Sequence, residues 1–121
     1  MTWTWKVKEG LLYGPDGERV ASGYSGLGAA KNNPTMESAV AQGPIPRGTY
    51  AIGAHYDSAR VGPFALPLTP LAGTNTFGRS AFRIHGDSIQ HPGSASHGCI
   101  IVSRAAREQI AASGDASLAV V

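Results

Sequence analysis

The chain begins with a strict alternation of polar and apolar residues, which is the pattern of a β-strand with one buried face. Trp3, Trp5 and Val7 fall on one face, and threonine and lysine residues fall on the other. Tryptophan buries a large apolar area, so we expect Trp3 and Trp5 to lie in the core rather than to form a platform for a ligand.

Turn-forming residues divide the chain after this first strand. The sequence Gly-Pro-Asp-Gly at 14–17 predicts a turn, and therefore a hairpin between residues 11–13 and 19–24. Residues 29–43 lack a strand pattern. They form either a loop, which we favour and expect to border a cleft, or a short helix over residues 36–42.

The middle of the chain contains two further strand patterns. Residues 49–56 predict a strand that Gly53 interrupts. Residues 64–71 contain Pro67 and Pro70, which cannot donate backbone hydrogen bonds. We therefore predict an edge strand or an irregular strand at this position.

The pattern changes to that of a helix near the end of the chain. Ser103 is a suitable N-terminal cap, the residues after it are rich in alanine, and Gly114 is a suitable C-terminal cap. These features predict one short helix at about residues 103–113. Residues 118–121 are predicted to form a last strand.

Composition and charge favour a fold that is mainly β and exclude some partners. The 121 residues include 16 glycines and 8 prolines, and only 15% are charged. This length predicts a single domain over residues 1–121 with one core, and the turn-rich composition is typical of short strands. A net charge of +2 without a run of lysines or arginines predicts neither a nucleic-acid partner nor a membrane partner.

The candidate chemistry centres on Cys99, the only cysteine, near which lie three of the four histidines. A cysteine becomes a nucleophile as its thiolate, and a neighbouring imidazole promotes that ionisation. His85 and His97 are the candidate neighbours. Gly98 precedes the sulfur and β-branched residues follow it, so we expect Cys99 at a turn that leads into a buried strand. The alternative is that Cys99 is an inert core residue.

The histidine side of this site has the pattern of a half-buried strand. Alternation places Phe82 and Ile84 on one face, and Arg83 and His85 on the other. His85 then emerges at a strand end. The residues between His85 and Ser96 are turn formers, and we expect them to form a loop that closes a site.

These residues carry a resemblance to a known family. His-Gly-Asp at 85–87 followed by Ser-His-Gly-Cys at 96–99 resembles the active-site signature of the YkuD-type L,D-transpeptidases, which are cysteine enzymes of peptidoglycan. Residues 43–52 are similar to the Pro-x-Gly-x-Tyr/Phe segment of that family. Together with Gly-Tyr-Ser-Gly at 23–26 and Asn-Pro at 33–34, they resemble a compact branch, the antibacterial L,D-transpeptidase-like effectors delivered by type VI secretion.

The resemblance implies a fold, an activity and partners. The fold is an L,D-transpeptidase-like β-sandwich or β-barrel-like sheet with one helix. The implied activity is that of an L,D-carboxypeptidase or L,D-transpeptidase on peptidoglycan stem peptides, without a cofactor. An immunity protein and a component of the secretion apparatus are the other implied partners. The first twenty residues contain no apolar segment typical of a signal peptide, so delivery by a secretion system from the cytoplasm to the periplasm of a target bacterium is expected.

The site residues are assigned roles in an acyl transfer. Cys99 is the nucleophile that forms a thioester, and His85 is the base and later the acid. Ser96 and His97 supply supporting hydrogen bonds, and the backbone N–H groups of Gly98 and Cys99 stabilise the oxyanion. By resemblance, the attacked bond follows the diamino acid at stem position three, and water, a D-amino acid or a second stem accepts the acyl group.

Two further residues are candidates for substrate binding. Arg83 either holds a stem carboxylate or is a solvated charge on the strand face. Asp87 either orients His85, binds a substrate amine or caps a local turn. Ile101 replaces the arginine or asparagine that the ordinary family commonly has two residues after the cysteine, so substrate clamping by that side chain is absent.

Two other classes of function use the same residues. One is a metal-dependent hydrolase, because the site region contains five side chains able to bind zinc. They are His85, Asp87, His91, His97 and Cys99. The other is a non-catalytic module that binds the cell wall and contains an inert cysteine. If Cys99 is the nucleophile of a carboxypeptidase or a transpeptidase, we expect the activity not to require His91 or His55.

Overall fold

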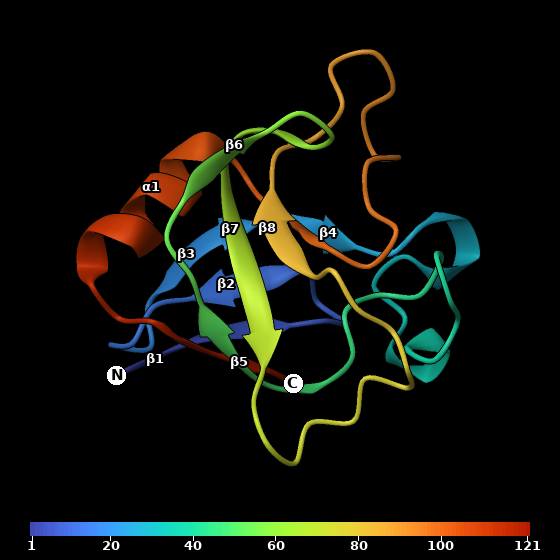
Figure 1. Ribbon diagram of the computed structural model, residues 1–121, viewed down its shortest axis with the longest axis horizontal. Helices are drawn as coiled ribbons and strands as arrows, with labels where there is room; N and C mark the ends of the chain where they lie inside the picture. The colour runs from blue at the N-terminus through green and yellow to red at the C-terminus, as the bar shows by residue number, and fades with distance from the viewer.

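A computed structural model describes residues 1–121, and its chain is mainly β with a single α-helix (Figure 1). The ten strands are β1 (Thr2–Lys6), β2 (Leu11–Tyr13), β3 (Arg19–Ser22), β4 (Tyr24–Ser25), β5 (Gly48–Ile52), β6 (Tyr56–Ser58), β7 (Gly62–Pro70), β8 (Arg83–His85), β9 (Ile100–Ile101) and β10 (Ser117–Val120). The helices are the 3₁₀ turns η1 (Gly28–Ala30) and η2 (Pro34–Met36), and α1 (Arg104–Ser113). The predicted fold class is confirmed.

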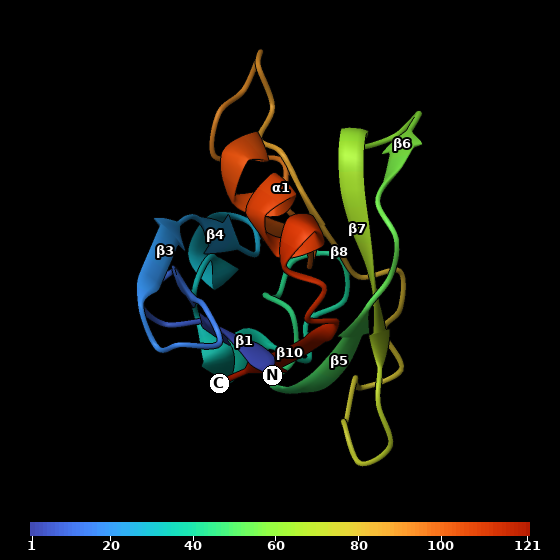
Figure 2. The ribbon, with the colours of Figure 1, turned by 90° about the vertical axis from the view of Figure 1, so that its left-hand side faces the viewer.

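The strands form one mixed sheet that curls on itself. Their order is β3-β2-β1-β10-β5-β7-β8-β9-β4, with β6 paired to β7 outside this path. The pairs β1/β10 and β8/β9 are parallel, and the other pairs are antiparallel. The two ends of the order, β3 and β4, are consecutive in the chain and are separated only by Gly23. The covalent chain therefore closes the curled sheet, and the arrangement is barrel-like (Figure 2).

Gly23 makes this closure possible because it packs directly against β9. A Cβ atom at this position would collide with the backbone carbonyl of Ile101. Only glycine allows so close an approach of two backbone segments. The corner between β3 and β4 thus explains part of the Gly-Tyr-Ser-Gly segment.

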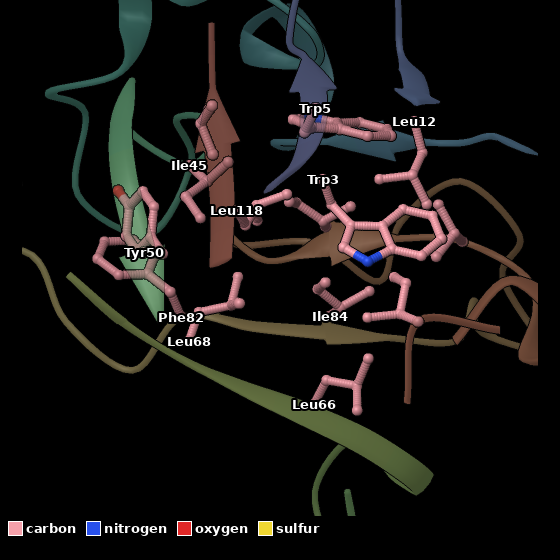
Figure 3. Packing of buried hydrophobic residues seen from close by; sticks show 14 of the residues in the cluster. Trp3, Trp5, Leu12, Ile45, Tyr50, Leu66, Leu68, Phe82, Ile84 and Leu118 are labelled. Carbon is pink, nitrogen blue, oxygen red and sulfur yellow. The ribbon is translucent and has the colours of Figure 1, made fainter. Parts of the chain in front are cut away.

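A cluster of sixteen buried apolar residues fills the inside of the curled sheet. Trp3 and Trp5 are 2% and 0% exposed, so the prediction that both tryptophans lie in the core is confirmed. Figure 3 shows Trp3 near Ile84 of β8, on the same side of the sheet as Leu118 of β10. The alternation of the first strand therefore sets the orientation of the whole core.

The predicted hairpin and helix are also present. Strands β2 and β3 pair in antiparallel fashion. Helix α1 begins after Ser103, whose Oγ accepts a hydrogen bond from the Ala106 N–H at 3.3 Å, and ends at Gly114 with φ of 74°. The helix packs against β7 and β8 (Figure 2).

Of the two alternatives predicted for residues 64–71, the edge strand is wrong, because β7 lies inside the sheet between β5 and β8, whereas its irregular pairing agrees with the other alternative. This strand changes partner along its length. It pairs with β8 at Leu66 and Pro67, and with β5 from Leu68 to Pro70. Over these residues β7 thus pairs with one of these two strands at a time.

The change of partner explains how Pro67 fits. The carbonyl of Pro67 accepts a hydrogen bond from the Gly53 N–H at 2.8 Å, just beyond the end of β5. Its nitrogen lies on that same side, where β5 has ended, so the missing N–H leaves no ladder bond broken. Gly53 also leaves room for the proline ring, because a Cβ atom there would lie 2.7 Å from Pro67 Cγ.

Residues 29–43 form the loop that the sequence favours, with the two short 3₁₀ turns and no α-helix over residues 36–42. None of the helices combines the length and the apolar character needed to traverse a lipid bilayer.

Candidate active site

The parallel pairing of β8 and β9 brings the predicted base and nucleophile together. Ile84 pairs with Ile100, and His85 pairs with Ile101. Ile84 and Ile100 point into the core. Because side chains alternate along a strand, the neighbouring positions, His85 and Cys99, both face the opposite side of the sheet.

A cleft of about 780 Å³ lies on that side. The residues that line it come from β8 and the segments on either side of it, from the turns before β7 and β9, and from the tip of the loop before β5. Its titratable or cationic lining side chains are Arg60, Arg79, Arg83, His85, Asp87, His97 and Cys99. Val40 and Ala41 form part of its rim, so the prediction that residues 29–43 border a cleft is confirmed.

Cys99 lies directly before β9, as predicted, and is 9% exposed. Its thiol donates a long hydrogen bond of 3.7 Å to the carbonyl of Ala81. Burial raises the pKa of the thiol, whereas hydrogen bonds from the backbone and side chain of Arg83 and the charges of Arg83 and Arg79 act in the opposite direction. The net shift is upward, so the thiolate requires a base that takes its proton.

His85 is the last residue of β8, again as predicted, and its side chain is buried. Its Nδ1 lies 2.9 Å from the carbonyl oxygen of Gly86. A carbonyl can only accept, so Nδ1 carries the proton and Nε2 has a free lone pair. Burial lowers the pKa of the imidazole. His85 is therefore a neutral base at neutral pH.

Nε2 of His85 has no hydrogen-bond partner in the protein. Trp5 Nε1 is the single fully enclosed side-chain nitrogen or oxygen that lacks a partner. Nε2 of His85 also lacks a partner but is not such an enclosed atom. It is therefore accessible from the cleft that His85 lines. This is the atom that can accept the proton of a thiol or of a water molecule.

Ser96 is fully buried and holds the turn that carries Cys99. Its Oγ donates to the Cys99 carbonyl at 2.6 Å and accepts from the Gly26 N–H at 2.8 Å. It also accepts a longer bond of 3.3 Å from the Gly98 N–H. One hydroxyl group therefore ties the cysteine turn to the segment after β4.

These bonds distinguish the two predicted oxyanion donors. The Gly98 N–H is directed at Ser96 Oγ, whereas the Cys99 N–H has no acceptor in the protein. Gly98 adopts φ of 137°, and a Cβ atom there would collide with Nη2 of Arg79. Glycine is required at this position, and the Cys99 N–H is the donor left free for an oxyanion.

His97 lies at the rim of the cleft and is exposed. Its Nδ1 lies 3.0 Å from the carbonyl of Ala41. The bond links the turn before Cys99 to the tip of the loop before β5. The side chain thus makes a supporting contact between two walls of the cleft.

Asp87 organises the loop after His85. Its Oδ1 accepts hydrogen bonds from the Tyr24 hydroxyl at 2.7 Å, from the Ser88 N–H at 2.8 Å and from the Gly93 N–H at 3.1 Å. Burial acts to raise the pKa of Asp87, but these bonds outweigh it and lower the pKa. No hydrogen bond joins Asp87 to His85, and the Gly86 carbonyl orients the imidazole instead.

Tyr24 completes the anchor of this loop. Its hydroxyl donates to Asp87 and accepts from the Ala95 N–H at 2.9 Å. Burial and the hydrogen bond to Asp87 raise the pKa of Tyr24 to about 12. Sequence reasoning noted Tyr24 only as part of a motif. Its contact with a residue 63 positions away has no local sequence signal.

The other candidate residues lie elsewhere or form no site. His91 is exposed in the loop between β8 and β9, and His55 stacks on Phe64 at 4.1 Å between ring centres. No group of three or more His, Cys, Asp or Glu side chains is arranged to hold a metal ion. The alternative of a metal-dependent hydrolase therefore has no ligand set to support it.

Sequence reasoning missed two buried arginines next to the site. Arg79 and Arg107 are 8% and 5% exposed, and both bind backbone carbonyl oxygens of distant segments. Arginine is rarely buried, so nothing in the local pattern distinguishes these two from the surface arginines.

A comparison with known protein families identifies a match that covers most of the chain. The model of the Tlde1 domain family matches residues 19–119. This segment contains both halves of the cleft and all strands except β1, β2 and the last residue of β10. No curated protein sequence matches the chain.

Proposed function

Because the chain belongs to the Tlde1 domain family, a family of type VI secretion effectors, we propose that it is an antibacterial cysteine enzyme that acts on peptidoglycan. Its reaction is L,D-carboxypeptidase or L,D-transpeptidase chemistry on stem peptides, through a thioester on Cys99. The observation that carries this proposal is that His85, the last residue of β8, and Cys99, the residue directly before the parallel strand β9, line the same cleft.

The first step is attack on an amide carbonyl. Nε2 of His85 takes the proton of the Cys99 thiol, and Sγ adds to the carbonyl carbon of the stem peptide. The raised pKa of the thiol and the neutral state of the imidazole support a proton transfer that accompanies binding rather than a preformed ion pair. Negative charge then develops on the carbonyl oxygen, and we assign its stabilisation to the Cys99 N–H, which has no acceptor in the protein.

The second step is collapse to the thioester. The C–N bond breaks, the electron pair leaves with the amine, and His85 returns its proton to that nitrogen. The leaving group is the terminal D-residue of the stem. Water or another amine then adds to the thioester while His85 again accepts a proton, and Sγ departs.

The cleft has a charge suited to an anionic peptide. Arg60, Arg79 and Arg83 line it, and Asp87 is the single carboxylate in its lining. The oxygen atoms of that carboxylate already accept hydrogen bonds from two N–H groups of its own loop and from the Tyr24 hydroxyl. Stem peptides carry several carboxylates, and a guanidinium matches the geometry of a carboxylate. Arg83 is the candidate ligand, because its charge acts on the pKa of the Cys99 thiol more strongly than the charge of Arg79 does.

The test is mass spectrometry of muropeptides after incubation with the pure protein. We expect stem tetrapeptides to lose the terminal D-residue, or to exchange it when a D-amino acid is present. Unchanged stem peptides under conditions where Cys99 is intact and the protein is folded would contradict the proposal. A hydrolysed glycan strand with intact stems would do the same.

A further inference from the structure

Two buried arginines flank the reactive pair, one on each side. Neither Arg79 nor Arg107 forms a salt bridge. Removing a guanidinium from water is costly, so each must be compensated by nearby groups. In both cases the compensation comes from backbone carbonyl oxygens, which is the arrangement of a clamp between chain segments rather than of an ion pair.

Arg79 clamps the cysteine turn to the loop before β5. Its Nη1 donates to the carbonyls of Glu37 and Pro44, the latter at 2.8 Å. Its Nη2 donates to the carbonyls of Gly43 at 2.9 Å and of His97 at 3.3 Å. The four hydrogen bonds of this side chain thus join its own segment to the loop before β5 and to the turn before β9.

The guanidinium of Arg79 occupies the space beside the nucleophile. It lies against Gly98, where any side chain would collide with Nη2. The guanidinium also lies over the ring of Phe82, with 5.6 Å between Cζ and the ring centre. Gly98 precedes Cys99, so the position of the sulfur depends on this contact.

Arg107 occupies the corresponding position next to His85, as Arg79 does next to Cys99. Its Nη1 donates to the carbonyls of Pro63 and Phe64, both at 2.8 Å, and its Nε donates to the Ser103 carbonyl at 3.4 Å. Its Nη2 lies against Gly86, 2.8 Å from where a Cβ atom would stand. Gly86 is the residue whose carbonyl orients the imidazole of His85.

We propose that Arg79 and Arg107 are positioning residues of the catalytic pair. Arg79 fixes the turn of Gly98 and Cys99, and Arg107 fixes the segment of His85 and Gly86. Together they set the approach of Sγ to Nε2. This inference goes beyond the proposed function, on which it rests only for the identity of the reaction.

The charges of the two arginines also act on the reactive groups. Burial raises the pKa of Cys99, and Arg83 and Arg79 oppose that shift. Burial lowers the pKa of His85, Arg83 and Arg107 lower it further, and Asp87 opposes them. Loss of Arg79 should therefore move the thiol titration to higher pH, and loss of Arg107 should move the imidazole titration to higher pH.

The first experiment measures the alkylation of Cys99 by iodoacetamide as a function of pH, which requires no peptidoglycan. In Arg79→Met we expect the profile to move to higher pH, and turnover to fall at least about tenfold because the sulfur is misplaced. Arg79→Lys retains the charge but cannot reach four carbonyls. We expect it to keep a profile near that of the wild type and still to lose turnover. Arg47→Met is the matched control, because Arg47 also binds Glu37 but is exposed.

The second experiment follows the ring protons of His85 by NMR through a pH titration. In Arg107→Met we expect the titration to move to higher pH and kcat to fall. Arg107→Lys should lose kcat as well, because a lysine cannot bind both carbonyls and back Gly86. Arg104→Met is the matched control on the same helix, because Arg104 is exposed and pairs with Glu108. It should match the wild type in both measurements.

Each outcome decides the inference. A wild-type alkylation profile and turnover in folded Arg79→Met, or a wild-type His85 titration and kcat in folded Arg107→Met, overturns the assigned role. Where a methionine variant does not fold, the lysine variant decides, and wild-type turnover in it overturns the role. If the wild-type protein leaves stem peptides unchanged, the proposed function fails, while the alkylation and NMR profiles still test the two arginines.

Discussion

Cys99 stands directly before β9 and His85 ends the neighbouring parallel strand β8, so the two residues face the same cleft from adjacent strands. Parallel neighbours cannot be joined by a tight hairpin and require a long crossover connection. The loop over residues 86–99 is that connection. The parallel pairing of β8 and β9 therefore explains why a long loop separates the histidine motif from the cysteine motif in the sequence.

The role of His85 predicts an unequal effect of histidine substitutions. His85→Ala should lower turnover by about 10² to 10⁴, because the reaction loses its general base. His91→Ala and His55→Ala should be close to the wild type, since both side chains lie outside the cleft lining. The measurement is the rate of D-residue release at equal folded concentration. A loss at His91 as large as that at His85 would show that the wrong base was assigned.

Burial of neutral His85 predicts that stability decreases at mildly acidic pH. Burial lowers the pKa of His85 below the ordinary value of 6.5 in the folded state. As pH falls from 6.5 towards the folded value, the unfolded chain binds a proton that the folded chain does not, so the free energy of unfolding decreases. Denaturant unfolding at pH 7.5 and 5.5 measures this difference.

Two variants separate this effect from other titrations. His85→Gln should reduce the difference in unfolding free energy between the two pH values, because it removes the buried imidazole. His91→Gln, which changes an exposed ring, should retain the full difference. An equal reduction in both variants would show that the acid sensitivity does not arise from His85.

Ser96→Ala should destabilise the protein and impair the reaction. The hydroxyl is fully buried and serves the Gly26 N–H, the Gly98 N–H and the Cys99 carbonyl. Leaving such groups without a partner costs about 1–3 kcal/mol. Chemical unfolding gives the loss of stability, and native alkylation of Cys99 reports the disturbed turn. Wild-type stability in this variant would show that water replaces the hydroxyl without cost.

Tyr24→Phe should loosen the loop over residues 86–96. The variant removes the hydroxyl that bridges Asp87 and the Ala95 N–H. We expect faster hydrogen exchange at Gly93 and Ala95, and a higher KM because this loop borders the cleft. Tyr56→Phe is the control, since Tyr56 is exposed. Unchanged hydrogen exchange at these two amides would contradict the proposal that Tyr24 anchors the loop.

Local patterns were sufficient for much of the fold and for the centre of the site. Alternation at Trp3 and Trp5 located the core, Ser103 and Gly114 located the helix, and turn residues located the hairpin. His85 and Cys99 were singled out because their chemistry is rare and their flanking residues have clear periodicity, and both residues line one cleft in the structure.

The features that were missed depend on contacts between distant segments. Pro67 is tolerated inside β7 because that strand changes partner there, which is a property of the sheet and not of residues 64–71. Arg79 and Arg107 are buried because backbone carbonyls from several loops converge on them. Neither arrangement leaves a periodic signal in the neighbouring sequence.

The most direct test of the account compares the wild-type protein with Cys99→Ala on a purified disaccharide tetrapeptide, with acid-quenched samples examined by intact-protein mass spectrometry. We expect the wild type to release the terminal D-residue and to carry an acyl group on Cys99 that neutral hydroxylamine removes. Cys99→Ala should keep the fold but show neither product nor adduct. Release of the D-residue by folded Cys99→Ala at the wild-type rate would contradict the claim that this sulfur is the nucleophile.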